Sequence, residues 1–503
     1  MLLSRFPITI DRRRKNALSG AIFRCLLIGL AAPFLRGAPA SAHEHVSKDD
    51  IHPERELLIT APAIVDSAAA QYPGPWSFGG LIEALAGEEK ASACVREWLE
   101  SWNQKNKVNE LEMEARYDIY RKVIRPLQER DGYQFDSAGP WEPQLKHAPF
   151  RLLAIVNRMD LCAPNVAGVE DATEARWQLL GRDKLFKKLL EDGVGKTPPA
   201  SFGYGFCSLL ANANSLKPDP TAGEGRFVFG AVDQAGAPLE GGWTIILEYK
   251  LSLKSPDTTV REWANAWHAL GSLSLSDPAY PVALEKLTRR FTHGPSVSLS
   301  QLRSSEAAFG SGREFRQFDF GGGSLSPAAL TRTPAPAFAA KNSPEHRALD
   351  SFIREQEVLI RSGIENVPVS LPEKQGSLHL LGGAALIPAN DSNFHWDLSG
   401  ISHETRRLFS LNTCNGCHGG ETGCSGGMHI RPRAAGEEAV LSRFLRTDGQ
   451  PLRVNDPEIK GLKVTYEEME DRAAILAALL EPNDSATNND LRLVLRDRLS
   501  RAH

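Results

Sequence analysis

The feature that most constrains this chain is a five-residue run near its C-terminal end, Cys414-Asn415-Gly416-Cys417-His418. Two cysteines spaced by two residues and followed at once by a histidine match the attachment sequence of c-type haem, in which both thiols form thioether bonds to the porphyrin. The histidine then lies under the iron as its proximal ligand. Cysteine is scarce, at 7 of 503 residues, so this pattern rarely arises by chance. The run predicts one covalent haem c on Cys414 and Cys417, with His418 on the iron.

Three later residues are candidates for the second iron ligand. Met428 and His429 follow His418 by ten and eleven positions, and about 3.3 Å per extended residue lets such a segment pass around a haem edge. Met469 has more chain to spare, but its acid-rich surroundings equally fit a packing residue on a helix. We therefore expect His429 or Met428 as the distal ligand, with Met469 as a weaker candidate.

A structural metal or disulfide knot is the alternative interpretation of the same segment. Thiolates and imidazoles are the ligands that tetrahedral zinc prefers, and structural zinc sites usually combine two separated ligand pairs. Here the candidate ligands fall within sixteen positions, and adjacent residues such as Cys417 and His418 rarely bind one tetrahedral ion. This favours haem over zinc. The candidate knot residues are Cys414, Cys417, His418, Cys424 and His429.

The N-terminal residues 1–42 have the order of a secretory signal. A basic cluster at residues 12–15 precedes a largely apolar stretch at residues 17–35, and Ala40-Ser41-Ala42 supplies a small-residue cleavage site. A membrane anchor is the alternative, but Arg24 interrupts the apolar stretch and leaves a core too short to span a bilayer comfortably. We expect cleavage near Ala42 and a periplasmic or secreted protein.

Cleavage changes the charge of the chain. Residues 1–42 contain seven basic residues and one acidic residue, so the mature chain keeps 51 basic and 61 acidic residues, a formal net charge of −10. An acidic exported chain is a poor candidate for nucleic-acid binding. No other stretch has the length and apolarity of a membrane span, so none is expected in the mature chain.

Six cysteines remain after cleavage, and an oxidising compartment favours pairing of those that haem does not use. Cys162 and Cys207 lie in one stretch of the chain and form the expected disulfide. Cys94 with Cys424 would have to join two domains, which we do not expect.

The order of apolar patterns predicts an α+β fold. Runs rich in β-branched and aromatic residues predict strands at 150–156, 226–230 and 243–249 of one sheet. Apolar residues at helical spacing predict helices at 76–86, 91–102, 109–128, 259–270, 278–291, 344–361 and 466–480. We expect an N-terminal mixed α/β-sheet domain at 57–335, a helical linker region at 336–390, and a small, mainly α-helical, cytochrome-c-like haem module at 391–503.

Several segments together resemble a poorly characterised family of exported bacterial proteins with a C-terminal CxxCH module. The resemblance covers most of residues 150–435 and implies that the two parts belong together, but it supplies no activity. Family members carry an aromatic residue where this chain has Met428, which favours His429 as ligand. The segments are Val156–Leu161, Gly223–Gly230, Glu248-Tyr249, Trp263-Ala264, Trp267–Gly271, Leu302-Arg303 with Glu306, Leu411–Thr422 and His429–Arg433.

Polar residues near the expected strand ends are candidates for a cleft with acid–base or metal chemistry. Turn formation and cross-strand ion pairing explain the same residues without chemistry, and no nucleotide-binding or hydrolase motif is present. The candidates are Asn157, Arg158, Asp160, Glu224, Arg226, Glu248 and His268.

These observations favour an exported monohaem electron-transfer protein over two alternatives. The first alternative is a redox enzyme whose active cleft lies in the N-terminal domain. The second is a non-redox envelope protein with a structural zinc or disulfide knot. An electron carrier further implies a redox partner protein or a small electron donor or acceptor.

Overall fold

A computed structural model describes residues 46–126, 149–159, 221–233, 235–253, 258–294, 297, 299–308, 312–361, 367–373, 376–391, 393–424 and 426–480. The predicted signal segment, Asp160 and the predicted disulfide pair Cys162 and Cys207 lie outside these residues. Contacts within the chain separate Met1–Glu44 from His45–His503. The described residues all belong to the second of these units.

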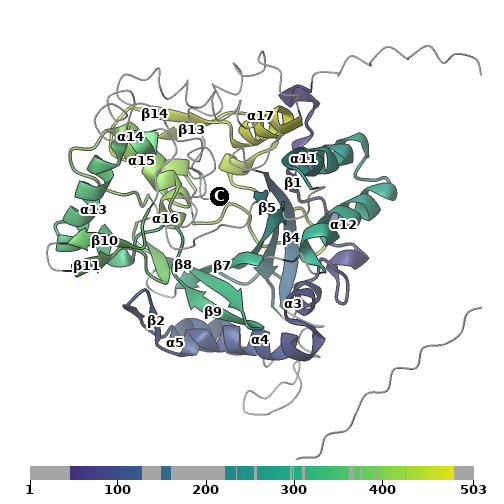
Figure 1. Ribbon diagram of the computed structural model, residues 1–503, viewed down its shortest axis with the longest axis horizontal. Helices are drawn as coiled ribbons and strands as arrows, with labels where there is room; N and C mark the ends of the chain where they lie inside the picture. The colour runs from purple at the N-terminus through teal and green to yellow at the C-terminus, as the bar shows by residue number, and fades with distance from the viewer. Residues whose placement is uncertain are drawn as a thin grey trace, which may run out of the picture. The chain divides into compact units, whose positions relative to one another are not determined.

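An antiparallel sheet organises the described unit (Figure 1). Its strands follow the order β1-β4-β5-β6-β7-β8-β12, and β9 also pairs with β8. Helices accompany this sheet, so the expected α+β class is confirmed, and β4, β5 and β6 contain the three predicted strands. The bounds are β1 (Leu58–Ile59), β4 (Phe150–Met159), β5 (Thr221–Ala231), β6 (Trp243–Ser252), β7 (Leu299–Ala308), β8 (Gly312–Gly321), β9 (Ser324–Ala328) and β12 (Ala384–Pro388).

The two faces of this sheet carry different side chains, because successive residues of a strand point to opposite faces. On β6, one face holds Trp243, Ile245 and Leu247, and we call this the helix face. The opposite face holds Thr244, Ile246 and Glu248. Gly230 of β5 pairs with Thr244, and a Cβ on Gly230 would lie 2.8 Å from Pro432 Cβ. The C-terminal segment therefore packs against this second face, which we call the motif face.

Helices α3, α4, α11 and α12 cover the helix face, and α3 and α11 begin with side-chain caps. Ser77 Oγ accepts a hydrogen bond from Gly80 N at the start of α3, and Thr259 and Glu262 form a capping box at the start of α11. Trp98 of α4 packs against Trp243, with ring centroids 6.1 Å apart. The bounds are α3 (Phe78–Ala86), α4 (Glu88–Glu100), α11 (Val260–His268) and α12 (Ala279–Thr292).

The chain after the main strands returns to the sheet before it reaches the motif. The predicted linker at 336–390 contains two helices and three strands, of which β12 pairs with β8. Beyond it, short helices and one hairpin surround the CNGCH run. The bounds are α13 (Pro344–Glu355), α14 (Glu357–Arg361), β10 (Ser370–Glu373), β11 (Gly376–His379), α15 (His403–Leu411), α16 (Cys414–Cys417), β13 (Leu452–Asn455), β14 (Lys463–Tyr466) and α17 (Glu468–Leu480).

Some predicted elements differ from the observed ones. The helix predicted at 109–128 is wrong at its start, where β2 (Asn106–Val108) and β3 (Leu111–Met113) form a hairpin with left-handed Asn109 and Glu110 at its turn. A short α5 (Tyr117–Ile119) and a π-helical turn follow. Strands β7, β8, β9 and β12 were not predicted. Within the described ranges, no helix is both long enough and apolar enough to span a bilayer.

Candidate metal centre

Helix α16 is a single turn that carries both cysteines of the CNGCH run. Thr413 caps it by accepting a hydrogen bond from Gly416 N at 3.2 Å, and Trp396 Nε1 donates to the same hydroxyl at 2.9 Å. At Gly416 a Cβ would lie 2.4 Å from the Ser410 carbonyl oxygen, so the close turn requires glycine. His418 follows as the C-cap residue.

Two buried imidazoles, His418 and His429, face each other after this turn, with ring centroids 4.4 Å apart. His418 Nδ1 lies 2.8 Å from the carbonyl oxygen of Gly427, so this nitrogen is the protonated donor. His429 Nδ1 lies 2.8 Å from the hydroxyl of Ser442. A hydrogen bond that anchors Nδ1 of a histidine and fixes the orientation of its ring is the usual arrangement around histidines that bind metals through Nε2.

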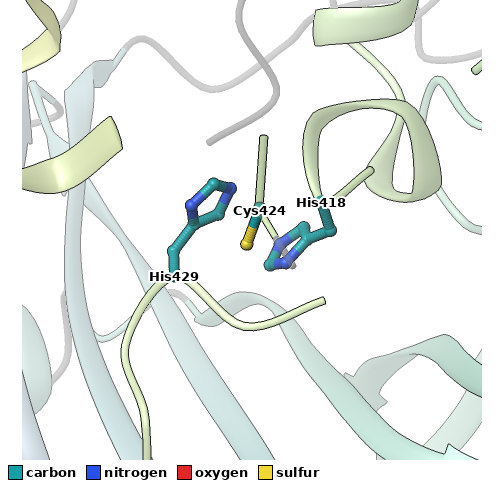
Figure 2. Close-up of side chains that lie close together, drawn as sticks. All are labelled: His418, Cys424 and His429. Carbon is teal, nitrogen blue, oxygen red and sulfur yellow. The ribbon is translucent and has the colours of Figure 1, made fainter. Parts of the chain in front are cut away.

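Two cysteine sulfurs complete this cluster. The ligand atoms of His418, Cys424 and His429 all lie within 4.8 Å of one another, and Figure 2 shows the Cys424 side chain beside the two rings. Cys417 Sγ lies 3.6 Å from His429 Nε2. The group of three offers one sulfur and two imidazole nitrogens, and Cys417 adds a second sulfur through its contact with His429.

Burial keeps the cluster uncharged. It lowers the pKa of His429 to about 4 and, with the neighbouring His429, lowers the pKa of His418 well below its usual value. Burial also raises the pKa of the Cys424 thiol to about 12. Neutral imidazoles have the free lone pair that a metal needs, and a bound metal displaces a thiol proton at a pH where the free thiol keeps it.

Cys414 has different surroundings from Cys417, although both belong to one helical turn. Its sulfur lies 3.9 Å from Arg303 Nη1 of β7, and its amide donates to Thr333 Oγ1 at 2.9 Å. Arg303 in turn pairs with the fully buried Glu248 of β6, with 2.8 Å from Nε to Oε1. An ion pair thus connects the motif face of the sheet to the first cysteine.

Four of the predicted cleft residues lie close together on β4, β5 and β6. Glu224 and Arg226 form an ion pair at 2.7 Å, and Arg226 lies 3.8 Å from Glu248. Arg158 pairs in register with Glu224, and its burial lowers its pKa well below the usual value. These are paired charges inside the protein, consistent with the structural explanation of the sequence pattern.

The other cleft candidates lie elsewhere. Asn157 donates to the backbone oxygen of Glu56 at 3.2 Å. His268 Nδ1 lies 2.8 Å from Glu56 Oε2, so its partner is a carboxylate of the N-terminal segment and not Glu248. His268 is partly exposed, and burial raises the pKa of Glu56.

The two methionine candidates point to different places. Met428 lies over the turn before β6, where a Cβ on Gly242 would be 2.9 Å from the Met428 sulfur. Met469 is buried at the start of α17 and borders a small, partly open pocket that Phe444 and Tyr466 also line. Of the three candidate distal ligands, His429 is the one that faces His418.

We tested the haem expectation against this geometry. A porphyrin separates its two axial ligands and carries the thioether sulfurs at its rim. Here a rim sulfur, on Cys417, lies 3.6 Å from His429 Nε2, and the rings of His418 and His429 are 4.4 Å apart between centroids. Cys414 and Cys417 are only 2% and 1% exposed, so protein atoms already cover the sulfurs that a haem would face. With the side chains in these positions a porphyrin does not fit between His418 and His429, whose ring centroids are 4.4 Å apart, and covalent haem stays a prediction from the sequence.

Two contributors to the site were not singled out from the sequence. Ser442 orients His429 across 13 positions, and Arg303 reaches Cys414 across 111 positions. The family resemblance includes Arg303 but gives it no role, and nothing local in the sequence points to Ser442.

Comparison with known proteins adds no relative: no family model, no curated protein and no solved structure matches this chain.

Proposed function

We propose that this chain is an exported electron-transfer protein whose metal centre is built on His418 and His429. One observation carries the proposal: each imidazole is anchored through Nδ1, to Gly427 or Ser442, and a ligand nitrogen of each ring lies within 4.8 Å of the other's and of the Cys424 sulfur. Orientation of this kind by outer hydrogen bonds is how proteins hold metal ligands in place.

The burial of the centre favours electron transfer over catalysis on a bound substrate. His418 and His429 are 8% and 6% exposed, and two sulfurs add to their nitrogens. A metal with four protein ligands has no open position for a substrate, whereas a catalytic metal keeps one. An electron can pass between the metal and an outside partner without any of the four protein ligands leaving the metal. The partner is therefore a redox protein or a small donor or acceptor that approaches from outside.

A second candidate keeps the same function with a different cofactor, one covalent haem c on Cys414 and Cys417 with His418 as the proximal ligand. The CNGCH run itself favours it, and His418 already has the anchored Nδ1 of a proximal histidine. In this form residues 391–503 would act as a cytochrome-c-like module, and the loop that carries Cys424 and His429 would have to lie farther from Cys417.

Export is part of the proposal, with cleavage near Ala42 and a periplasmic or secreted location. The basic cluster, the apolar stretch and the small-residue site at the N-terminus support it. N-terminal sequencing of protein recovered from outside the cytoplasm is expected to start near His43.

The test is spectroelectrochemistry of full-length protein produced with its own leader and with haem maturation active. We expect a metal-dependent absorption change that reverses with potential and is absent in His429→Ala. His403→Ala, which removes an exposed histidine at the start of α15, is the matched control and should behave as the parent protein. A metal-loaded protein without any reversible redox change would overturn electron transfer and leave a structural metal site.

A further inference from the structure

We infer that Cys417, His418, Cys424 and His429 form one four-ligand site for a thiophilic metal ion, copper or zinc, bound directly by the side chains. The inference rests on the proposed metal centre and deepens it by naming all four ligands and the class of ion.

The measured separations agree with a shared ion. Metal–sulfur bonds of about 2.3 Å and metal–nitrogen bonds of about 2.0–2.1 Å at a tetrahedral angle put sulfur and nitrogen about 3.5 Å apart. Cys417 Sγ and His429 Nε2 are 3.6 Å apart. The ligand atoms of His418, Cys424 and His429 lie within 4.8 Å of one another, so small side-chain shifts close the set around one ion.

The ligand types select the metal. Thiolates bind copper(I) and zinc well, imidazole suits both, and hard cations such as magnesium and calcium prefer oxygen ligands. Two sulfurs and two nitrogens in a tetrahedral arrangement are typical of zinc. Because zinc has no redox chemistry, the proposed electron transfer requires copper at this site, and zinc there would be structural. A divalent ion that binds both thiols takes their two sulfur electron pairs and releases two protons to solvent, so no oxidant or reductant is needed.

The backbone explains how ligands so close in sequence reach one point. Gly423, Gly426 and Gly427 all have positive φ, and these bends reverse the chain between Cys417 and His429. At Gly427 a Cβ would lie 2.4 Å from Arg313 Cδ, so only glycine fits where the loop passes over β8. Arg313 Nε also donates to Gly426 O at 2.8 Å. The sheet thus fixes the loop that carries Cys424.

The first cysteine of the run separates this inference from the haem form. Neither Cys414 nor Cys417 belongs to the group of three, but Cys417 Sγ contacts His429, whereas Cys414 contacts Arg303 and Thr333. A direct site therefore needs Cys424 and tolerates loss of Cys414, whereas covalent haem needs Cys414 and tolerates loss of Cys424.

The experiment measures metal and haem content of full-length protein, exported with haem maturation active, for the parent, Cys424→Ser, Cys414→Ser and Cys94→Ser. We expect about one copper or zinc per chain, no covalent haem, at least a tenfold loss of metal in Cys424→Ser, and retention in Cys414→Ser. Cys94→Ser, a buried cysteine on α4, controls for loss of a thiol alone.

X-ray absorption of the parent protein gives a result that does not depend on variant folding. Two sulfur and two nitrogen neighbours around copper or zinc support the inference. Iron in a covalent porphyrin, an ion with only oxygen and nitrogen neighbours, or no bound metal overturns it. A haem-loaded protein with reversible redox chemistry would overturn this inference alone, and a zinc-loaded protein without redox chemistry would overturn electron transfer alone.

Discussion

The helix face and the motif face of the sheet are built on the same strands and are both buried, yet they are stabilised in different ways. The helix face packs aromatic rings, with Phe318 of β8 5.0 Å from Trp102 and 6.0 Å from Trp98 between ring centroids. The motif face carries paired charges, with Arg303 on Glu248. The helix face also holds a buried charge group, Arg316 with Glu314 and Glu306, but it lies at the β7–β8 end beside Trp102. The first face gains stability from apolar burial, and the second only avoids the cost of burying unpaired charge.

This difference explains why the C-terminal cluster lies on the motif face. A cluster of thiols and imidazoles needs fixed hydrogen-bonding and charged neighbours, and Arg313 supplies one by donating to Gly426 O. A purely apolar face could pack the loop but could not orient it. Since paired groups set direction as well as distance, the polar face is the one that positions a site.

The largest effect is expected on the helix face, from Trp98→Ala. Trp98 is fully buried, and its removal leaves a cavity among rings that include Phe78 and Trp243. We expect the free energy of unfolding to fall by about 3–5 kcal/mol in urea titrations followed by circular dichroism. Val282→Ala, at a position 69% exposed on α12, should change it by less than about 0.5 kcal/mol. Equal losses in the two variants would refute the burial argument.

The next largest loss of stability is expected on the motif face, from Glu248→Gln. This variant leaves the buried Arg303 guanidinium without its carboxylate, and we expect a loss of about 3 kcal/mol in the same titration. The double variant Glu248→Leu with Arg303→Met is the control, because it removes both charges together. It should lose less than the single variant. If the double variant is the less stable of the two, paired charge is not what matters on this face.

A pH effect sharpens the comparison, because the helix face also holds one buried carboxyl with a shifted pKa. Burial raises the pKa of Glu306 to about 7, Glu314 adds to the rise, and Arg316 opposes it. The folded form then binds this proton more tightly than the unfolded chain, whose glutamate pKa is about 4.3. Stability is therefore expected to fall as pH rises from about 4.5 to 7 and to level off above that.

Glu306→Gln tests this shift. The variant should gain on the order of 2 kcal/mol relative to the parent between pH 4 and pH 8. Glu89→Gln, at an exposed position of α4, should follow the parent at every pH. A parallel course of the Glu306→Gln and parent curves would show that this carboxyl does not titrate in the folded protein.

The smallest expected effect is on metal affinity, through the hydrogen bond that orients His429. Ser442→Ala removes the partner of His429 Nδ1, and loss of such an outer hydrogen bond typically weakens metal binding by about tenfold or more. Chelator competition on the metal-loaded protein measures the change. The exposed Ser351 of α13 provides the control variant Ser351→Ala, and an unchanged affinity in Ser442→Ala would mean that the hydroxyl does not orient the ring.

Prediction from sequence succeeded where one periodic pattern dominated. The runs around Leu153, Phe229 and Ile245 are apolar and β-branched, and each lies in an observed strand. Strands β7 and β8 were missed because charged residues interrupt their apolar pattern, among them Arg303 and Arg316. These charges are buried only because carboxylates on the same or adjacent strands pair with them. The hydrophobic pattern of a sequence does not show which carboxylate will pair with each arginine.

The site residues also divide into those that the sequence predicts and those that it does not. His418, Cys424 and His429 lie within twelve positions, so their proximity follows from a short chain that glycines bend back on itself. The choice between Met428 and His429 does not follow from it, because adjacent side chains point in different directions. It depends on Gly242, which receives the Met428 thioether, and on Ser442, which holds the His429 ring.

The sequence by itself determined the α+β class, most of the helices and the run of cysteine and histidine that marks the site, because these depend on neighbours within about one turn or one strand. Only the tertiary structure decided which sulfurs and nitrogens share a point, and that Cys414 leaves this set for Arg303, 111 positions away in the chain. Ligand geometry is set by distances of a few ångströms between distant segments, and these distances exist only after the sheet has formed.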